Sequence, residues 1–177
     1  MNYNSIRRDE FERVAMSHTG SLLRAALRIL REEPAAEDLV QETFMRAWRA
    51  FDQFERGTNC KAWLFRIMLN ICNETRRVAR TRSDVVSFDD ARVRAISPHA
   101  RAPQVTALEV SSALDSLSEE HRLVLIMAVV EGFTCKEIAD ICSVPIGTVM
   151  SRLSRGRAAL RNRLRRFETA ESTSKAG

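Results

Sequence analysis

A break between two amphipathic helical segments near the carboxyl terminus constrains this chain more than any other feature of its sequence. Thr134 stands three residues before Glu137, the spacing of a capping box, and predicts where the first helix starts. The Ser-Val-Pro run at residues 143–145 predicts its end and the start of a second helix, because proline is tolerated in a first helical turn. Val149 and Leu153 lie one turn apart and form the inward face of that second helix. The pattern is typical of a helix-turn-helix.

The second helix leaves a strongly basic surface facing outward. Seven arginines lie between Arg152 and Arg166 with no acidic residue among them, and like charges at helical spacing repel one another. Because an anionic partner would relieve that repulsion, we interpret the segment as a DNA-binding one; the alternative is a helical hairpin whose arginines are only solvated. The residues predicted to reach base edges are Thr148, Ser151 and Arg152, and those predicted to contact phosphates are Arg155 and Arg157.

The charge of the chain is unevenly distributed. The formal net charge is +5, yet residues 61–82 and residues 135–177 each carry a net +5, whereas residues 1–60 and 83–134 are net acidic. Two separate basic segments favour two contacts on one polyanion over a uniformly adhesive surface.

Helical periodicity runs through most of the remaining sequence, and no segment reads as a strand. Apolar residues recur at three- and four-residue steps. Pro34 and the Ser-Glu-Glu run at 118–120 are typical helix starts. Helices are predicted over residues 11–30, 34–51, 61–80, 104–117 and 118–130, followed by the helix-turn-helix. The predicted fold class is therefore all-α.

The periodicity is lost over residues 81–103, which Ser-Asp, Ser-Pro and Ala-Pro pairs punctuate. A tether of about twenty residues is unusual inside one compact domain, so we expect two small helical domains joined by a flexible linker. The expected limits are residues 1–82 for the first domain, 83–103 for the linker, 104–168 for the second domain and 169–177 for a disordered tail.

The first basic segment combines amides and cations on one predicted helix. Its polar residues are Lys61, Arg66, Asn70, Asn73, Arg76 and Arg77. Asparagine can pair bidentately with adenine, while arginine and lysine hold the nucleic-acid backbone. Beside the polar loop at residues 54–59, Trp63 and Phe65 are candidates for stacking on an unpaired base. For Trp63, a place in the helical core is the preferred interpretation.

The helix predicted over residues 35–51 has exposed positions of mixed charge, which make a poor DNA surface. These positions are Asp38, Gln41, Glu42, Arg46 and Arg49. A protein-docking face and a merely solvated face are both compatible with this pattern.

The sequence holds no motif for chemistry of its own. Cys135 and Cys142 lie too far apart for a disulfide and lack a histidine to complete a metal set. Paired acids, a nucleophile constellation and a phosphate loop are all missing, so neither an enzyme nor a bound cofactor or metal is expected. The amino terminus does not read as a signal peptide, and no run approaches the length of a membrane span. Together with cysteines read as free thiols, these features predict a cytoplasmic location.

Three blocks, in this order, resemble the extracytoplasmic-function (group IV) sigma factors of bacteria. Residues 38–48 are similar to the family's helix for docking on core RNA polymerase, and residues 61–70 to the start of its −10 reading helix. Residues 117–125 and 147–157 are similar to its −35 reading domain, and the match covers about residues 8–167. The resemblance implies a sigma-2-like bundle and a sigma-4-like helix-turn-helix domain. Both would bind the polymerase while engaging the −10 and −35 elements of promoter DNA.

The resemblance also implies roles for single residues. Those implied to face the beta-prime subunit of the polymerase are Asp38, Gln41, Glu42 and Arg46. Those implied to hold a flipped base of the −10 element are Gly57, Thr58, Asn59, Cys60 and Lys61, with Asn70, Asn73, Arg76 and Arg77 alongside. The linker is implied to pass near the RNA exit path. Met150 stands where relatives place an arginine, and Ser154 stands where some place an aromatic residue.

The function that the resemblance implies is that of a transcription initiation factor for specific promoters. Its implied partners are core RNA polymerase (beta-prime and beta subunits), promoter DNA and an anti-sigma factor, because members of the family are often held inactive by one. A stand-alone helix-turn-helix regulator is the alternative, and it would leave the polar face at residues 70–77 unused. A base-modifying enzyme would need a His/Cys metal set with an adjacent glutamate, which this sequence lacks.

Overall fold

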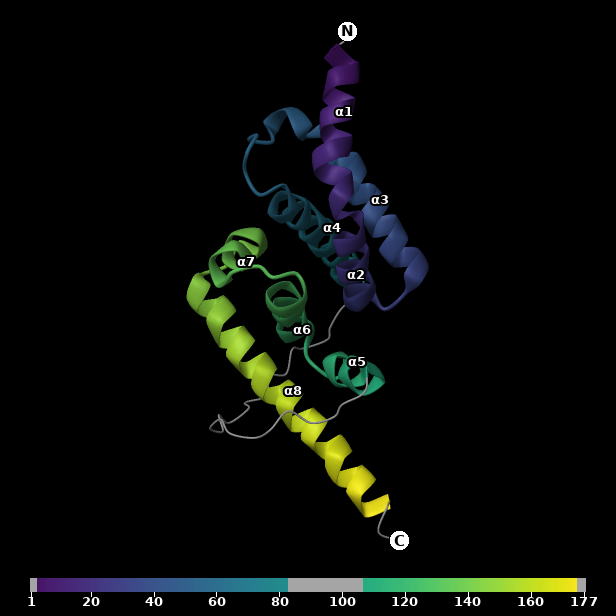
Figure 1. Ribbon diagram of the computed structural model, residues 1–177, viewed down its shortest axis with the longest axis vertical. Helices are drawn as coiled ribbons and strands as arrows, with labels where there is room; N and C mark the ends of the chain where they lie inside the picture. Colours follow the sequence, from purple (N-terminus) through teal and green to yellow (C-terminus); the bar gives the residue numbers. More distant parts are fainter. Residues whose placement is uncertain (1–2, 83–106, 175–177) are drawn as a thin grey trace. The chain divides into compact units, whose positions relative to one another are not determined.

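The computed structural model describes residues 3–82 and 107–174, and within these ranges every regular element is a helix (Figure 1). The predicted all-α class is therefore confirmed. The helices are α1 (Tyr3–Ala15), α2 (Thr19–Leu30), α3 (Glu33–Arg49), α4 (Cys60–Arg82), α5 (Ala107–Asp115), α6 (Glu119–Leu125), α7 (Cys135–Cys142) and α8 (Ile146–Ser174). The linker predicted at residues 83–103 lies outside the described residues.

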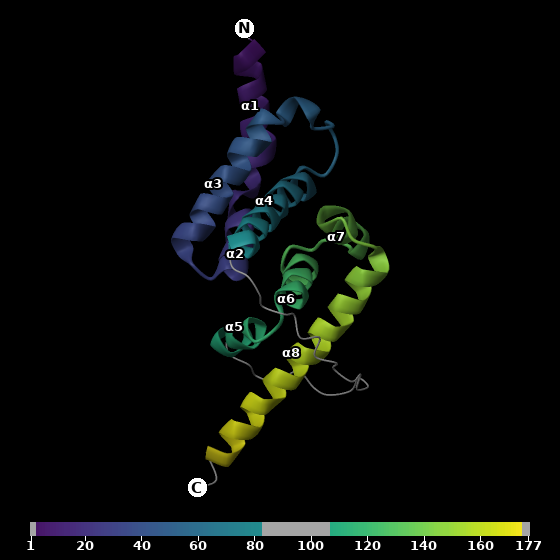
Figure 2. The same cartoon turned by 180° about the vertical axis from the view of Figure 1, so that it is seen from behind.

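The described helices form two compact units. One contains α1–α4 together with residues 136–144, and the other contains α5, α6 and α8. In the first unit α3 packs against both α2 and α4, and α3 and α4 lie side by side in both views (Figures 1 and 2). In the second unit α5 and α6 both pack on α8.

Aromatic rings fill the part of the first unit where α1 meets the end of α3. The Phe11 ring makes edge-to-face contacts with the rings of Phe44, Trp48 and Phe51, at centroid distances of 6.5, 5.2 and 5.1 Å. Phe51 in turn stacks on Phe54, with centroids 6.0 Å apart. Because such ring pairs stabilise a core beyond the burial of their area, this cluster anchors the chain between α3 and α4.

An arginine that the sequence analysis did not single out fixes α1 to this cluster. The Arg7 guanidinium lies 4.1 Å from the centroid of the Trp48 ring and donates to the Trp48 carbonyl oxygen (2.7 Å) and to Asp52 (2.8 Å). Arg56 reaches back to the Glu10 carboxylate with two hydrogen bonds of 2.7 and 2.9 Å. Charge-assisted bonds thus hold α1 against the segment that follows α3.

Leu117, Leu125 and Leu153 form a buried cluster in the core of the second unit. Gly156 is buried at the crossing of α6 and α8, where a Cβ atom would lie 3.1 Å from Leu125 Cδ1 and 3.3 Å from the carbonyl oxygen of His121. This close approach explains why a glycine stands in the middle of a long helix, at a position where its flexibility costs stability.

The described helices differ from the prediction in the first unit. The helix expected over residues 11–30 is interrupted by a 3-10 turn at Met16–His18. The Thr19 hydroxyl donates to the Met16 carbonyl (2.6 Å) and the Ser17 hydroxyl to the Val14 carbonyl (3.4 Å). Such bonds from side chains to the backbone compete with a regular helix.

Two further differences fall in the second unit. Residues Ile126–Val130 wind as a π-helix, in which the Glu131 N–H bonds to the Ile126 carbonyl (3.0 Å), and Gly132 follows at a φ of 75°. In addition, α8 continues to Ser174. The helix thus extends past residue 169, where the sequence analysis placed the start of a tail, and neither glycine nor proline interrupts this stretch.

Candidate nucleic-acid interface

Backbone hydrogen bonds fix the turn between α7 and α8. Ser143 adopts the left-handed conformation after α7, with a φ of 54°. The Val144 N–H bonds back to the Ala139 carbonyl (3.1 Å), as in a Schellman C-cap. The Pro145 carbonyl then accepts the N–H groups three and four residues further on, at 2.9 and 3.3 Å. The predicted helix-turn-helix is thus present, and α8 begins directly after the proline.

The inward face of α8 agrees with the sequence analysis, because Val149 and Leu153 are both buried. The three residues predicted to read bases differ in their exposure to solvent. Ser151 is exposed, and its hydroxyl donates to the Thr148 carbonyl (2.9 Å). Thr148 and Arg152 are half-buried on one flank of the helix. Of the three predicted base readers, Ser151 alone points fully outward.

The two predicted phosphate contacts, Arg155 and Arg157, are both exposed. Successive helical residues are rotated by about 100°, so these two side chains leave α8 on opposite flanks, about 160° apart. A helix lying in a major groove faces a phosphate backbone on each side. This arrangement therefore suits contacts with both strands.

Arg152 is paired within the protein, which the sequence analysis did not predict. Its Nη2 lies 2.8 Å from Oε2 of Glu120 in the first turn of α6, and the arginine side chain is 26% exposed. The ion pair orients the guanidinium beside α6 and leaves part of it accessible. From the sequence, Glu120 was expected only as a helix-start residue, because local spacing gives no sign of a pairing between residues so distant in the chain.

A second arginine of the basic run also contacts the protein itself. Arg163 Nε donates to the Ser116 hydroxyl (3.0 Å), which ties α8 to the turn between α5 and α6. Beneath this turn, Arg122 is buried with Nη1 3.7 Å from the Asp115 carboxylate. Arg152 and Arg163 thus each contact the protein itself, so the described part of the basic run is not one uniform solvent-facing surface.

In the first unit, the loop before α4 is a tight turn. Gly57 has a φ of 85°, a conformation that favours glycine. Thr58 bonds to the Glu55 carbonyl through its hydroxyl (2.6 Å) and its N–H (3.2 Å), while Asn59 Oδ1 accepts the Ala62 N–H (3.1 Å) as an N-cap. Gly57, Thr58 and Asn59 are all exposed, so the loop presents a preformed polar surface.

Cys60 departs from its predicted place in the base-binding loop. Its side chain is buried, and burial raises the pKa of its thiol. It is the first residue of α4, and Leu64, one turn further on, is fully buried, so Cys60 belongs to the inward face of the helix. The structure therefore places the Cys60 side chain against the core, and the implied part of this residue in the base-binding loop stays a prediction.

The polar face predicted on α4 is present along the described part of the helix. Asn70, Asn73 and Arg77 are exposed, while Lys61 and Arg76 are half-buried. The structure thus brings the two asparagines and Arg77 onto the surface of one helix, whose first turn adjoins the loop of Gly57–Asn59.

The two aromatic candidates for base stacking lie against the core. Phe65 is buried, so the prediction that it stacks on a base is wrong. Trp63 is half-buried, with its ring centroid 4.9 Å from that of Phe54 and 6.5 Å from that of Phe51. This agrees with the interpretation that was preferred for Trp63.

The mixed-charge face of α3 has an exposed part and a part that is engaged in ion pairs. Asp38 and Gln41 are exposed, whereas Glu42 and Arg46 are half-buried. Arg46 donates from Nε to Glu42 (2.7 Å) and from Nη1 to Glu74 of α4 (2.6 Å). The bond to Glu42, followed by that to Glu74, raises the pKa of the Arg46 guanidinium. Arg46 therefore joins α3 to α4, so only part of its side chain is left for a partner.

One exposed residue of this face was missed by the sequence analysis. Met45 is 45% exposed, one helical turn after Gln41 and two turns after Asp38. Its spacing from those residues, i+4 and i+7, was the signal that would have placed it on the same face. The three side chains form a surface with a polar and an apolar part.

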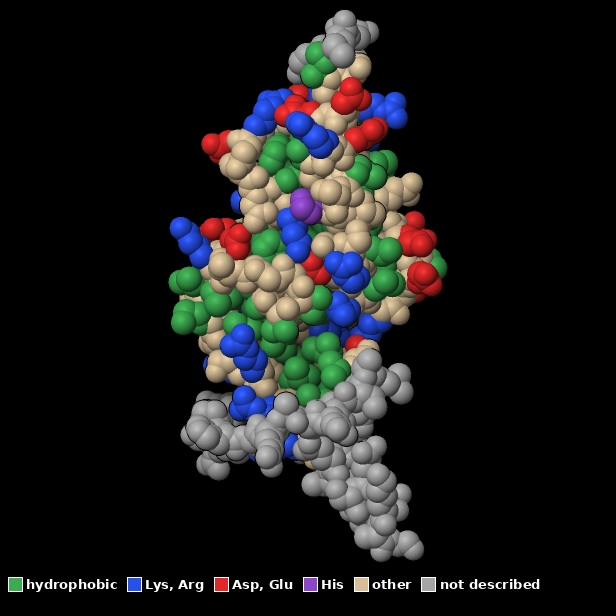
Figure 3. All heavy atoms as spheres, viewed as in Figure 1, with side chains coloured by type: hydrophobic (Ala, Val, Ile, Leu, Met, Phe, Trp, Pro, Cys, Tyr) green, Lys and Arg blue, Asp and Glu red, His purple; other side chains and the backbone are tan. Residues whose placement is uncertain are grey.

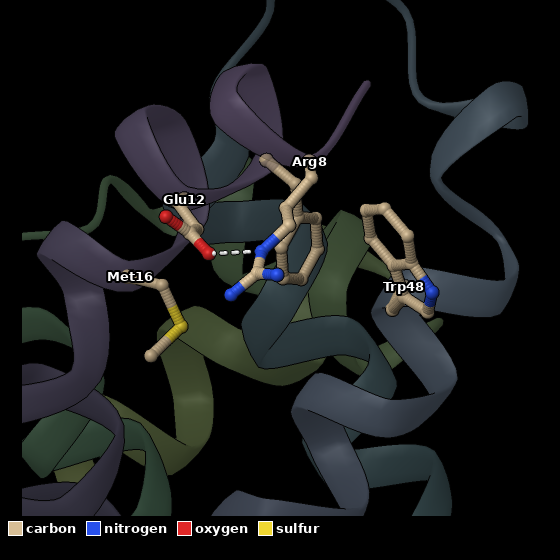
Figure 4. A pocket seen from close by; sticks show the side chains of 5 residues that line it. Arg8, Glu12, Met16 and Trp48 are labelled. Atoms are coloured by element: carbon tan, nitrogen blue, oxygen red, sulfur yellow. Dashed lines mark hydrogen bonds and ion pairs between the residues drawn. The ribbon is translucent and has the colours of Figure 1, made fainter. Parts of the chain in front are cut away.

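A hollow of about 580 Å³ lies between α1 and the end of α3 (Figure 4). Arg8, Phe11, Glu12, Met16 and Trp48 line it. The Arg8 guanidinium donates to Glu12 (2.8 Å) within the hollow, and this bond raises the pKa of Arg8. The mixture of two rings, a thioether and one ion pair makes it an apolar surface with a charged edge.

The described residues, 3–82 and 107–174, contain no group of three His, Cys, Asp or Glu side chains close enough together to hold a metal ion. None of the four cysteines, which all fall within these ranges, forms a disulfide. No described helix combines the length and the apolar content that crossing a membrane requires.

Within the described residues, the observations define an all-helical protein with a helix-turn-helix at α7 and α8 and a separate amide-rich helix, α4. Family models agree with this class. The model of sigma-70 region 2 matches residues 14–82, and that of sigma-70 region 4 matches residues 107–160.

Individual relatives make the family explicit. The chain is 36% identical to the ECF RNA polymerase sigma factor SigL of Mycobacterium tuberculosis, over 81% of this chain and 82% of SigL. It is 33% identical to EcfG of Rhodopseudomonas palustris, over 79% and 77% of the two chains. With SigE of Mycolicibacterium smegmatis the identity is 34%, and the match spans 65% of the length of SigE. The chain belongs to the ECF family of RNA polymerase sigma factors.

Solved structures agree in fold. The sigma factor RpoE of Bartonella quintana, in complex with the anti-sigma factor NepR, matches with a TM-score of 0.69 and 34% identity, over 88% of this chain and 97% of RpoE. CnrH, in complex with the cytosolic domain of CnrY, matches with a TM-score of 0.62 and 25% identity, over 88% and 87% of the two chains.

Proposed function

We propose that this protein is a transcription initiation factor that binds core RNA polymerase and directs it to specific promoters. The observation that carries the proposal is the presence of both sigma-70 regions in one chain, each containing a helix with an exposed polar face. The family assignment supports the activity; the polymerase and the promoter are proposed partners.

The −35 element is proposed to be bound by α8. Exposed Ser151, Arg155 and Arg157 support this role, as does Arg152 where its guanidinium remains accessible beside Glu120. Thr148 is half-buried on the same flank as Arg152, so it is proposed as a contact at the edge of the interface. Phosphate contacts fix the position of such a helix, and base contacts give it specificity.

The −10 element is proposed to be bound by the loop before α4 and by α4 itself. Gly57, Thr58 and Asn59 form the exposed turn, and Lys61 follows it. Further along α4 the proposed contacts are Asn70, Asn73, Arg76 and Arg77. Capturing an unpaired base costs a few kcal/mol of unstacking, which a preformed loop offsets more readily than a mobile one because less ordering is required.

Core polymerase is proposed to bind α3 through Asp38 and Gln41, with Glu42 and Arg46 at the edge of the interface. The docking surface would face the beta-prime subunit, and the second unit would meet the beta subunit. We propose residues 1–82 and 104–168 as the two domains and residues 83–103 as the connection between them. Placement in group IV of the sigma factors stays a prediction.

Regulation by an anti-sigma factor is proposed by similarity. RpoE and CnrH were solved with NepR and with the cytosolic domain of CnrY, respectively. A sigma factor acts in the cytoplasm and contributes no bond chemistry of its own, so we propose a cytoplasmic protein that is not an enzyme. The stand-alone regulator is disfavoured because it leaves the region 2 match over residues 14–82 without a use.

The experiment that tests the proposal begins with overexpression and RNA sequencing, which identify the promoters that respond. Purified full-length chain is then mixed with core polymerase and one such promoter. We expect a transcript that depends on the chain. The double variants Asn70→Ala/Asn73→Ala and Arg155→Ala/Arg157→Ala should both reduce it, and Arg13→Ala/Arg28→Ala, a charge-matched change on exposed positions of α1 and α2, should not. A transcript that forms without the chain, or tight operator binding by the chain alone, would contradict the proposal.

A further inference from the structure

Two large apolar side chains are exposed at the start of α8. Ile146 is 49% exposed and Met150 is 57% exposed, although Val149 beside them is buried. Their four-residue spacing places them next to each other on one face of the helix. Hydrophobic side chains reach the surface at the N-terminal end of α8 (Figure 3). The pair is thus an apolar spot on the helix that is proposed to read DNA.

The same flank of α8 continues as a cationic surface. Ser154, Arg157 and Arg161 follow Met150 at steps of three or four residues, and all three are exposed. Arg152 and Thr148 lie on the opposite flank. The outward surface of α8 therefore has a polar flank, with Arg152, and an apolar-cationic flank, with Met150 and Arg157.

The chemistry of this flank favours one occupant. From Ile146 to Arg165, α8 carries no acidic residue, so its field attracts a polyanion more than a neutral or basic protein surface. In the DNA major groove, the C5 methyl group of thymine is the apolar group that distinguishes a base. The cationic part of this flank favours a polyanion, and its apolar part favours a methyl group. DNA that contains thymine in its major groove offers both.

We propose that Met150 and Ile146 are specificity-determining residues that contact thymine methyl groups in the −35 element. This inference rests on the proposed function, in which α8 enters that element. Ser154 is small and leaves room beside Met150, and Arg157 holds a phosphate on the same flank. The polar flank reads base edges through Arg152, while the apolar flank reads methyl groups.

The test removes single methyl groups from the DNA. The full-length chain, bound to core polymerase, first selects its preferred −35 element from a duplex library. Each thymine of that element is then replaced in turn by deoxyuridine, which lacks the C5 methyl and pairs in the same way. We expect one or two positions at which binding weakens about three- to fivefold, the effect of one buried methyl group.

Matched variants assign the effect to these side chains. Met150→Gln removes the apolar end at similar length and should abolish the difference between thymine and deoxyuridine at one position. Met150→Leu keeps an apolar side chain and should retain the difference. Ile146→Ser should abolish it at a second position, if two are found. Met16→Gln, a change at an exposed methionine in the first unit, should leave every position unchanged.

Several outcomes would overturn the inference. Equal binding of thymine and deoxyuridine by the unchanged protein at every position excludes methyl recognition, as does a selected element without A·T pairs. Methyl sensitivity that persists in both Met150→Gln and Ile146→Ser assigns the contact to other residues. Weaker binding of Met150→Gln to core polymerase without DNA makes the pair a protein-docking spot. If the chain bound to core polymerase selects no element and supports no promoter-dependent transcription, the proposed function itself is contradicted. If transcription is supported but no methyl sensitivity is found, only the present inference is contradicted.

Discussion

Glu120 of α6 and Arg152 of α8 form an ion pair of 2.8 Å, so an acidic neighbour orients the arginine that is expected to read a base. The pair couples α8 to α6, which packs against it. Its contribution to stability is small, because partly exposed pairs are worth about 0.2–1 kcal/mol. The effect of the ion pair on base discrimination should therefore be larger than its effect on the free energy of unfolding.

Replacing Arg152 with alanine should cost about 1–3 kcal/mol at one or two base pairs of the −35 element. Glu120→Gln should reduce the same discrimination and raise affinity for unrelated DNA, because it removes a negative charge beside the guanidinium. The measurement is binding of the polymerase-bound chain to promoters with single substitutions. An equal loss for Arg152→Ala across all sequences would make the residue a phosphate contact instead.

Gly156→Ala should destabilise the second unit by about 1 kcal/mol. The helix propensity of alanine favours the change by about 1 kcal/mol, but overpacking costs typically 1–3 kcal/mol. The new Cβ would lie 3.3 Å from the backbone oxygen of His121, which cannot rotate away. Gly147→Ala is the matched control and should be neutral or stabilising, because an added Cβ atom there would meet no atom within 4 Å beyond its chain neighbours and its own helix backbone. Thermal unfolding of both variants decides; a stabilised Gly156→Ala would contradict the close packing of α6 and α8.

Ser143→Gly should stabilise the turn between α7 and α8 by about 1 kcal/mol, because a left-handed conformation is strained for residues with a Cβ atom. The φ of 54° at Ser143 is the reason for choosing this position. Ser143→Ala keeps the Cβ atom and should give no gain. Denaturant unfolding compares the two, and equal stability of both variants would count against strain at this residue.

Asp38→Ala combined with Gln41→Ala should weaken binding to core polymerase and leave the melting temperature nearly unchanged, because both side chains are exposed. Met45→Ala should weaken the same binding through lost apolar contact. Arg46→Ala breaks the ion pairs with Glu42 and Glu74, so it should also loosen the packing of α3 on α4. Co-purification with polymerase and thermal unfolding separate these effects; a melted double variant would show that the exposed face was misassigned.

Thiol reactivity should divide the cysteines into two classes. Burial raises the pKa of Cys60 and Cys72, which disfavours the reactive thiolate. In the folded protein at pH 8, a thiol reagent should modify these two slowly and the half-buried Cys135 and Cys142 faster. Mass mapping after partial modification checks the order, which equal rates at all four residues would refute.

The same pKa shift makes the free energy of unfolding depend on pH. The pKa values of the Cys60 and Cys72 thiols are higher in the folded than in the unfolded protein. Their contribution to the free energy of unfolding is therefore complete at neutral pH and is lost as the pH rises above about 8.5.

Local spacing was sufficient for the fold class and for the faces of the long helices. Val149 and Leu153 are buried as their one-turn spacing predicted, and Asn70 and Asn73 are exposed as predicted. A repeating apolar pattern reports which side of a helix is buried wherever one side packs and the other meets water. The burial of the Cys60 side chain was not foreseen because the residue was grouped with the loop before it, although its one-turn distance from the buried Leu64 already indicated the inward face.

The contacts that shape the interface could not be predicted in the same way. Arg152 with Glu120 and Arg46 with Glu74 join residues that are distant in the chain, and each pairing depends on which helices pack together. The π-helix at Ile126–Val130 and the 3-10 turn at Met16–His18 also depend on individual hydrogen bonds rather than on periodicity. The charge distribution along the sequence therefore predicted a basic surface. Which of its arginines are free to contact a partner depends on how the helices pack.

The bond from Arg46 to Glu74 has a mechanical consequence. It braces the helix proposed to dock on the polymerase against the helix proposed to read the −10 element, at an N–O distance of 2.6 Å. A large assembly that seats α3 would thereby also set the angle at which α4 meets the DNA. Without this ion pair, a chain that still binds the polymerase through α3 would hold α4 at a less defined angle to the −10 element.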